Sequence, residues 1–185
     1  MVPRDAIAYL FFPILTTLYN SGMIKNKDKE IEETINLIES FNPKFAMRLA
    51  KKIKNKIPII YTSNSYYAVA YRLKTQINEN AKRLAFVGIF SEVNHNEVEA
   101  KIGNKFSIII FRDTKDDKEI IKQIEAFIRV KGPRAHIIEL KGKNNLAKIF
   151  YGIHFGDWIS YYLAKLNNIK IKSTNNIEAI KKMIK

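Results

Sequence analysis

The stretch IPIIYTSNS, residues 57–65, decides the fold that the sequence predicts. Its first five residues are apolar without interruption, as a strand buried on both faces of a sheet requires. The hydroxyl and amide residues that follow lead into a helical pattern over residues 66–82. The stretch therefore opens an alternating pattern of strands and helices.

The alternation continues on the C-terminal side of this stretch. Strands are predicted at residues 84–89, 106–111 and 136–140, and helices at residues 94–100, 115–131 and 144–166. This order predicts an α/β fold, a doubly wound parallel sheet flanked by helices and connected by right-handed crossovers. Ligands of such domains gather at the carboxyl ends of the strands.

Helices are also predicted on the N-terminal side, within residues 5–56. The first helix is predicted over residues 6–24 and is apolar on nearly every side over residues 6–18, and the second, over residues 28–41, carries one apolar face. Asn42 and Pro43 suit the cap and the first position of a third helix. The apolar run of residues 6–18 is too short to cross a bilayer, so we expect neither a signal peptide nor a membrane anchor.

One domain is expected over residues 1–185, because no repeat, linker or second boundary interrupts the pattern. Residues 167–185 form a polar tail that ends in a short helix. The chain has no cysteine, which excludes disulfides, a thiol nucleophile and a thiolate metal site and favours a cytoplasmic location.

The formal net charge of +14 attracts anions of every kind. Lysines are spread along the whole chain and are not interleaved with aromatic residues in one block, so no dedicated nucleic-acid surface is expected. Genome composition or growth at high temperature would explain the same charge. We therefore expect DNA to bind only weakly and with strong dependence on salt.

The hydroxyls of Thr62, Ser63 and Ser65 meet free backbone amides at a predicted helix N-terminus, which is a candidate anion site. Ordinary helix capping selects the same residue types, and the glycines of a phosphate loop are absent. Both interpretations stay open from these residues alone.

Glu79, between Asn78 and Asn80, lies near the end of a predicted helix, where the helix dipole disfavours a carboxylate. A carboxylate flanked by amides suits a general base, whereas a solvated helix-end residue is the simpler interpretation. His95 follows the second predicted strand, where its imidazole can exchange protons near pH 7. His136 and His154 are most simply structural, and the spacing of the three histidines predicts no metal site.

Four segments carry a family resemblance: VPRDA at residues 2–6, AYRLKTQINENAK at 70–82, NHNE at 94–97 and GDWISYYLA at 156–164. In this order they resemble the second half of archaeal and bacterial bifunctional phosphoglucose/phosphomannose isomerases, which belong to the sugar-isomerase (SIS) superfamily. The resemblance implies an SIS-type domain. It covers essentially the whole chain.

The resemblance also implies roles for individual residues. Glu79 would be the base that moves a proton between C1 and C2 of the sugar through a cis-enediol, and His95 would assist ring opening from the neighbouring subunit. The segment TNNIEAIK, residues 174–181, is similar to the C-terminal motif of the family. By that similarity, Thr174 leaves room for either C2 epimer and Lys181 helps to open the ring.

The sequence departs from the family pattern at positions that concern phosphate binding. Lys101 stands where the family often has Trp, and residues 62–64 lack the usual glycines. In the family, the first SIS domain supplies the phosphate loop, so we expect a separate N-terminal SIS half as partner. The resemblance implies a homodimer that interconverts glucose 6-phosphate or mannose 6-phosphate with fructose 6-phosphate and needs no cofactor. A non-catalytic module that binds sugar phosphates, with a regulatory or structural role, is the alternative.

Overall fold

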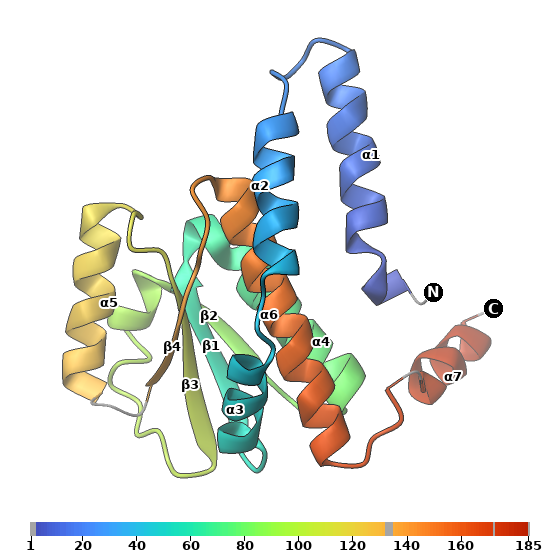
Figure 1. Cartoon of the computed structure of the whole chain (residues 1–185). Helices are drawn as coiled ribbons and strands as arrows, with labels where there is room; N and C mark the ends of the chain where they lie inside the picture. The colour runs from blue at the N-terminus through green and yellow to red at the C-terminus, as the bar shows by residue number, and fades with distance from the viewer. Residues whose placement is uncertain (1–2, 132–134, 172, 185) are drawn as a thin grey trace.

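The computed structural model describes residues 3–131, 135–171 and 173–184, and within them a parallel four-stranded sheet of order β2-β1-β3-β4 (Figure 1). The strands are β1 Ile57–Ser63, β2 Phe86–Phe90, β3 Phe106–Arg112 and β4 Ala135–Glu139. The α-helices are α1 Ile7–Asn20, α2 Asp28–Glu39, α3 Lys44–Ile53, α4 Tyr67–Ala81, α5 Lys118–Lys131, α6 Asn145–Leu166 and α7 Asn175–Met183. Three short 3₁₀ helices are η1 Pro3–Asp5, η2 Asn64–Tyr66 and η3 Glu92–Asn94.

The apolar run of residues 57–61 is the core of the central strand. Ile60 pairs with Val87 of β2 on one side and with Ile109 of β3 on the other, in parallel register. Alternate residues of β1 enter different apolar clusters, since Ile60 faces the cluster of α3, α4 and α6, whereas Tyr61 faces the cluster of α5. Burial on both faces explains why polar alternation is absent from this strand.

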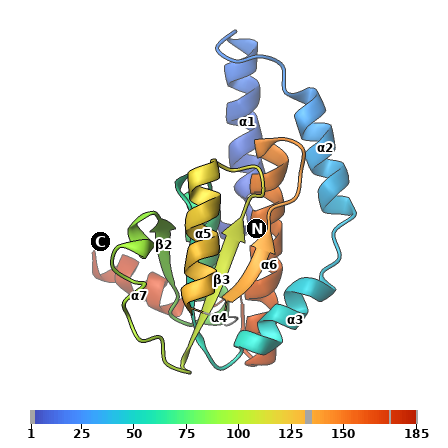
Figure 2. The ribbon, with the colours of Figure 1, turned by 90° about the vertical axis from the view of Figure 1, so that its left-hand side faces the viewer.

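Helices cover both faces of the sheet, with α5 on one face and α3, α4 and α6 on the other (Figures 1 and 2). The long helix α6 packs against α2, α3 and α4. Gly152 permits the approach to α4, because a Cβ at this position would lie 2.6 Å from Cγ1 of Val69. The predicted doubly wound α/β fold is thus confirmed.

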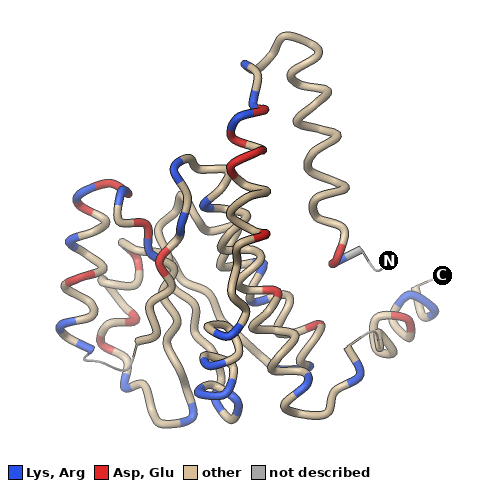
Figure 3. The backbone as a smooth tube through the Cα atoms, viewed as in Figure 1, with Lys and Arg blue, Asp and Glu red and all other residues tan. Residues whose placement is uncertain are grey.

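The apolar helix α1 has little cover. The ring of Phe12 stacks on that of Phe150 in α6 at 5.3 Å between centroids, but α1 buries none of its residues. Leu10 and Ile14 are each 62% exposed, and α1 carries no charged residue (Figure 3). No helix among the described residues is long and apolar enough to cross a membrane.

The segment that was expected to form a polar helix at residues 94–100 forms η3 and a series of turns instead. The amide of His95 donates to the carbonyl of Glu92, and that of Ala100 donates to the carbonyl of Glu97. Such bonds to the third preceding residue tighten the backbone beyond an α-helix. The prediction of a helix was therefore wrong for this segment.

A buried ion pair joins the end of β3 to the first turns of α6. Nζ of Lys148 donates to Oδ2 of Asp113 at 2.6 Å, and the hydroxyl of Tyr66 donates to the same oxygen at 2.6 Å. Burial opposes ionisation of Asp113, but the hydrogen bonds from Lys148 and Tyr66 outweigh it and lower the pKa of the carboxyl. The cluster fixes three elements at the carboxyl end of the sheet.

Lys148→Met should lower the free energy of unfolding by about 3 kcal/mol, because it leaves a buried carboxylate without its counter-charge. Urea denaturation followed by circular dichroism measures this loss. The matched control Lys122→Met removes an exposed lysine that pairs with Glu119, and it should change stability by less than about 0.5 kcal/mol.

The loss should also depend on pH. The pKa of Asp113 is lowered in the folded chain, so its contribution is complete above the unfolded pKa, near pH 4, and declines as pH falls through the folded value. The stability difference between the wild type and Lys148→Met should accordingly shrink in acid. A difference that stays constant from pH 7 to pH 3 contradicts this assignment.

Candidate active site

Glu79 lies in the last turn of α4, partly exposed, beside the guanidinium of Arg4. Nη1 of Arg4 lies 3.3 Å from Oε2 of Glu79, and Nε of Arg4 donates to Oδ1 of Asn80 at 2.8 Å. The side chain of Arg4 is itself buried. The chain thus holds a carboxylate and a guanidinium together at one helix end, although the two residues are 75 positions apart.

The amides that flank Glu79 were predicted to orient its carboxylate, and the structure gives them other partners. Nδ2 of Asn78 donates to the carbonyl of Arg83, and Nδ2 of Asn80 donates to Oγ of Ser160. Consecutive residues of a helix point about 100° apart, which prevents neighbours from converging on one side chain. Asn80 contributes to the site by accepting a hydrogen bond from Arg4.

A polar network attaches the backbone of η1 to α4 and α6. The carbonyl of Arg4 accepts hydrogen bonds from Nη2 of Arg72 at 2.8 Å and from Nε2 of Gln76 at 3.2 Å. Both donors also contact the carboxylate of Asp157, at 3.2 Å and 2.8 Å. The network joins three of the segments that carry the family resemblance.

The C-terminal tail passes the same helix end. Nη2 of Arg4 donates to the carbonyl of Ile171 at 2.6 Å. Nζ of Lys82 donates both to the carbonyl of Glu79 and to that of Ser173. Thr174, the next residue, therefore lies in the segment held beside Glu79, and its side chain makes no capping bond to α7.

Lys181 is not brought to this place. It lies on α7, which buries none of its residues, and it pairs with Glu178 on the same helix at 3.0 Å while 59% exposed. Figure 1 shows α7 standing away from the sheet beyond the end of α6.

His95 lies at the other end of β2 from Glu79. The helix α4 runs antiparallel to the strands, so Glu79 precedes β2 and the exposed His95 follows it. The five residues of β2 span roughly 16 Å. Within one chain, Glu79 and His95 therefore do not meet.

Glu97 anchors the loop that carries His95. The hydroxyl of Tyr61 donates to Oε2 of Glu97 at 2.6 Å, and burial together with this hydrogen bond raises the pKa of Tyr61 far above its ordinary value. Gly88 provides the space, since a Cβ there would lie 3.0 Å from Oε1 of Glu97. Glu97 positions the loop, a role that the motif spacing did not reveal.

The hydroxyls at the end of β1 form hydrogen bonds within the chain. Oγ1 of the buried Thr62 donates to the carbonyl of Phe111 at 3.3 Å, and Oγ of Ser63 donates to the carboxylate of Asp116. Ser65 is exposed. The carboxylate of Asp116 beside Ser63 makes this loop electrostatically unfavourable for phosphate.

Arg4 is the residue of this site that had no predicted role. It stands in the VPRDA segment, which contributed to the family resemblance, but charge and spacing in the sequence do not connect it to Glu79. Among the described residues, no group of three or more His, Cys, Asp or Glu side chains could hold a metal ion.

Comparison with known proteins agrees with this architecture. The family profile described as "Bacterial phospho-glucose isomerase C-terminal SIS domain" matches residues 43–184. A bifunctional phosphoglucose/phosphomannose isomerase from Thermoplasma acidophilum is 38% identical over 98% of this chain and 59% of its own length. A D-glucosamine-6-phosphate 4-epimerase from Sulfolobus acidocaldarius is 30% identical over 96% of the chain and 55% of its own length.

Solved structures share the fold. Glucosamine-6-phosphate deaminase from Thermotoga maritima superposes with a TM-score of 0.66 at 10% identity, over 92% of this chain and 54% of that protein. A glucose-6-phosphate isomerase like protein from Thermus thermophilus gives 0.59 at 18% identity, over 74% and 46% of the two chains.

The chain thus spans somewhat more than half the length of the curated relatives that it matches. The match with residues 43–184 covers more than half of the chain. This chain belongs to the family of bacterial phosphoglucose isomerase C-terminal SIS domains.

Proposed function

We propose that this chain is the base-carrying half of an isomerase that interconverts glucose 6-phosphate or mannose 6-phosphate with fructose 6-phosphate. The observation that carries the proposal is the pair of Glu79 and Arg4, held 3.3 Å apart beside the C-terminal tail. The names of the relatives, which are bifunctional phosphoglucose/phosphomannose isomerases, support the substrate class.

In the proposed reaction the Glu79 carboxylate removes the proton from C2 of the open-chain aldose phosphate. The electrons of that C–H bond form the C1–C2 double bond of a cis-enediol, and negative charge develops on the C1 oxygen. A proton passes from the C2 hydroxyl to the C1 oxygen, and the same carboxyl returns its proton to C1, which gives the ketose with its carbonyl at C2. A single residue can serve both steps because C1 and C2 are adjacent.

Arg4 is suited to stabilise the charge that develops on the sugar oxygens. Its guanidinium is buried, and its hydrogen bonds to Asn80 and to the carbonyl of Ile171 fix its orientation before substrate binds. A preorganised cation beside a developing oxyanion is among the strongest contributions to catalysis. Thr174, in the tail that Lys82 holds, is placed in this proposal beside the C2 hydroxyl.

His95 and Lys181 are proposed to assist ring opening. His95 lies at the opposite end of β2 from the Glu79 of its own chain, so in this proposal it serves the Glu79 of a second subunit. Lys181 would have to approach by a different placement of α7, which makes no buried contact.

The phosphate group is proposed to bind mainly to a separate N-terminal SIS half. Thr62 and Ser63 already donate to internal acceptors, which argues against them as phosphate ligands and leaves the exposed Ser65 as the candidate in this loop. The chain also covers only part of its relatives. The same two observations favour the alternative function, a sugar-phosphate-binding module without turnover.

Glu79→Gln should abolish most turnover in a mixture of this chain with the N-terminal SIS half of a relative. Gln keeps the size and polarity of the side chain but cannot accept the C2 proton, so kcat for fructose 6-phosphate should fall about a hundredfold or more. The matched control is Glu39→Gln, which alters the last residue of α2 and should keep full activity.

Exchange of the C2 proton with deuterium from the solvent distinguishes the two functions. Exchange that Glu79→Gln removes supports the base. Near-normal turnover by the variant places the base elsewhere, and binding of sugar phosphate without exchange in the wild-type mixture supports the non-catalytic module.

Arg4→Lys should lower kcat about tenfold or more and leave KM nearly unchanged. Lysine keeps the charge but cannot contact Glu79, Asn80 and the carbonyl of Ile171 together, so the cation loses its fixed direction. Steady-state kinetics of the same mixture measure both constants. If KM rises and kcat does not change, Arg4 contributes to substrate binding and not to the transition state.

Self-association is expected because α1 exposes an apolar surface and His95 is proposed to act across a subunit interface. Sedimentation velocity at micromolar concentration should show a dimer. Leu10→Glu should shift the equilibrium to monomer, because it places a charge on the exposed side of α1. The control Val130→Glu, at an equally exposed site on α5, should remain dimeric, and a wild type that is only monomeric contradicts the proposal.

A further inference from the structure

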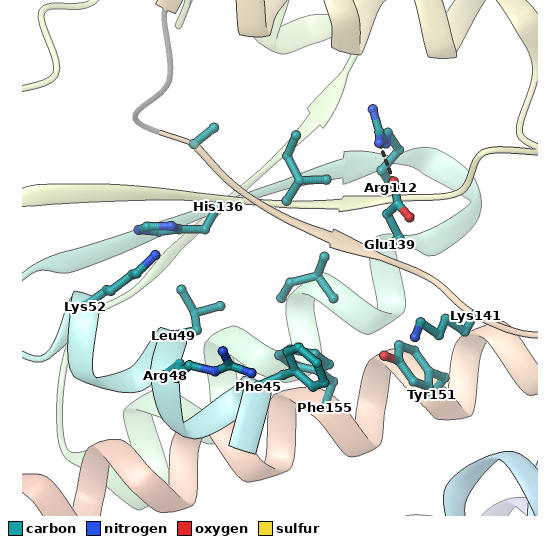
Figure 4. Close-up of a pocket in the computed structure, with 13 residues that line it drawn as sticks. Phe45, Arg48, Leu49, Lys52, Arg112, His136, Glu139, Lys141, Tyr151 and Phe155 are labelled. Carbon is teal, nitrogen blue, oxygen red and sulfur yellow. Dashed lines mark hydrogen bonds and ion pairs between the residues drawn. The ribbon is translucent and has the colours of Figure 1, made fainter. Parts of the chain in front are cut away.

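A groove at the β4 edge of the sheet is not used by the proposed reaction. It lies between α3, β4 and α6, and its volume of about 670 Å³ is that of a small-molecule site (Figure 4). Glu79 belongs to α4, which lies on the same face of the sheet but packs against β1 and β2, away from the β4 edge. The groove and the candidate active site are therefore separate.

Positive charge dominates the lining of the groove. Arg48 and Lys52 are one turn apart on α3, and Lys141 stands at the opposite end of the groove (Figure 4). None of these three forms an ion pair within the part of the chain that the structure describes. The one carboxylate of the lining, Glu139, is already paired with Arg112.

His136, on β4, lies in the same positively charged surroundings. Figure 4 shows its imidazole directed toward Lys52. Burial, followed by the charges of Lys52 and Lys56, lowers the pKa of His136. Among the described residues, no carboxylate charge acts on His136 to offset those of the lysines, so an anion placed here would be stabilised by several groups at once.

Arg112 supplies an unused donor. Its Nη2 is bound to Glu139, but its Nε is buried and has no hydrogen-bond partner. A buried donor without an acceptor is costly, and native structures generally provide a partner or a ligand for it. Arg112 lies with Glu139 at the end of the groove opposite His136 and Lys52 (Figure 4), so the case for an anion rests on the free cations of α3.

The remaining wall is aromatic. Phe45 lies under the guanidinium of Arg48, with 4.7 Å between the guanidinium carbon and the ring centroid. Tyr151 and Phe155 of α6 form the floor (Figure 4). An inorganic ion alone would leave this apolar surface uncovered, whereas an anion attached to a larger body would cover it.

We propose that this groove binds a small phosphate monoester, with its phosphate among Arg48, Lys52 and His136 and its remaining part against Phe155 and Tyr151. A phosphate ester has several acceptor oxygens and up to two negative charges, which matches two cations and an imidazole. The fixed fork of Arg48 suits paired phosphate oxygens.

Nuclear magnetic resonance titration of the histidines in the full chain tests the proposal. AMP, glucose 6-phosphate and inorganic phosphate are added separately at constant ionic strength, and adenosine serves as the probe without phosphate. Each phosphate probe should raise the pKa of His136, because a bound anion offsets the charges of Lys52 and Lys56. His154, which accepts a hydrogen bond from Trp158, is the internal control and should not change.

Lys52→Gln should weaken AMP binding about tenfold, as the loss of one charge-assisted contact predicts. The matched control Lys122→Gln, on α5, should bind as the wild type does. Tighter binding of AMP or glucose 6-phosphate than of inorganic phosphate supports contact of the ligand with the aromatic wall. The tighter of the two shows which group carries the phosphate. A His136 signal that no phosphate probe moves, equal binding of adenosine and AMP, or equal losses in both variants overturns the proposal.

Discussion

Burial of β1 on both faces is the constraint on which the rest of the structure depends. Ile60 and Tyr61 are fully enclosed, one against α3, α4 and α6 and the other against α5, with β2 and β3 paired on either side. Both neighbours of β1 are parallel to it, and the helices that connect parallel strands are those that cover its two faces. The antiparallel course of α4 then places Glu79 at the amino end of the sheet and the loop of His95 at its carboxyl end.

The candidate active site depends on segments that lie far apart in the chain. Arg4 reaches Glu79 only because Arg72 and Gln76 of α4 hold its carbonyl, and the carbonyl of Ile171 completes its hydrogen bonds. These contacts bring the first described residues, the end of α4 and the C-terminal tail to one place. The cation of the site is therefore oriented by tertiary packing.

The net charge of +14 does not show which cations are paired within the chain and which are free. Ion pairs engage Lys148 and Arg4, whereas Arg48 and Lys52 form none within the described residues and line the β4 groove with His136. Unpaired cations next to aromatic rings make the groove a distinct electrostatic feature. It is the basis for a second phosphate site that does not depend on turnover at Glu79.

The strands and their alternation with helices could be predicted from the sequence, because the spacing of apolar residues follows which side chains are buried. The family could be predicted because its motifs lie in order along the chain. The boundaries of the other elements moved by at most four residues, and residues 94–100 formed turns because bonds to the third preceding residue prevailed there. The motifs singled out Glu79 and His95 as candidate site residues, and their roles stay predictions. The contacts of Arg4 with Glu79 and of Ser63 with Asp116, and the groove around His136, became visible only in the tertiary structure. They depend on which side chains of distant segments come together, and no local sequence pattern encodes such contacts.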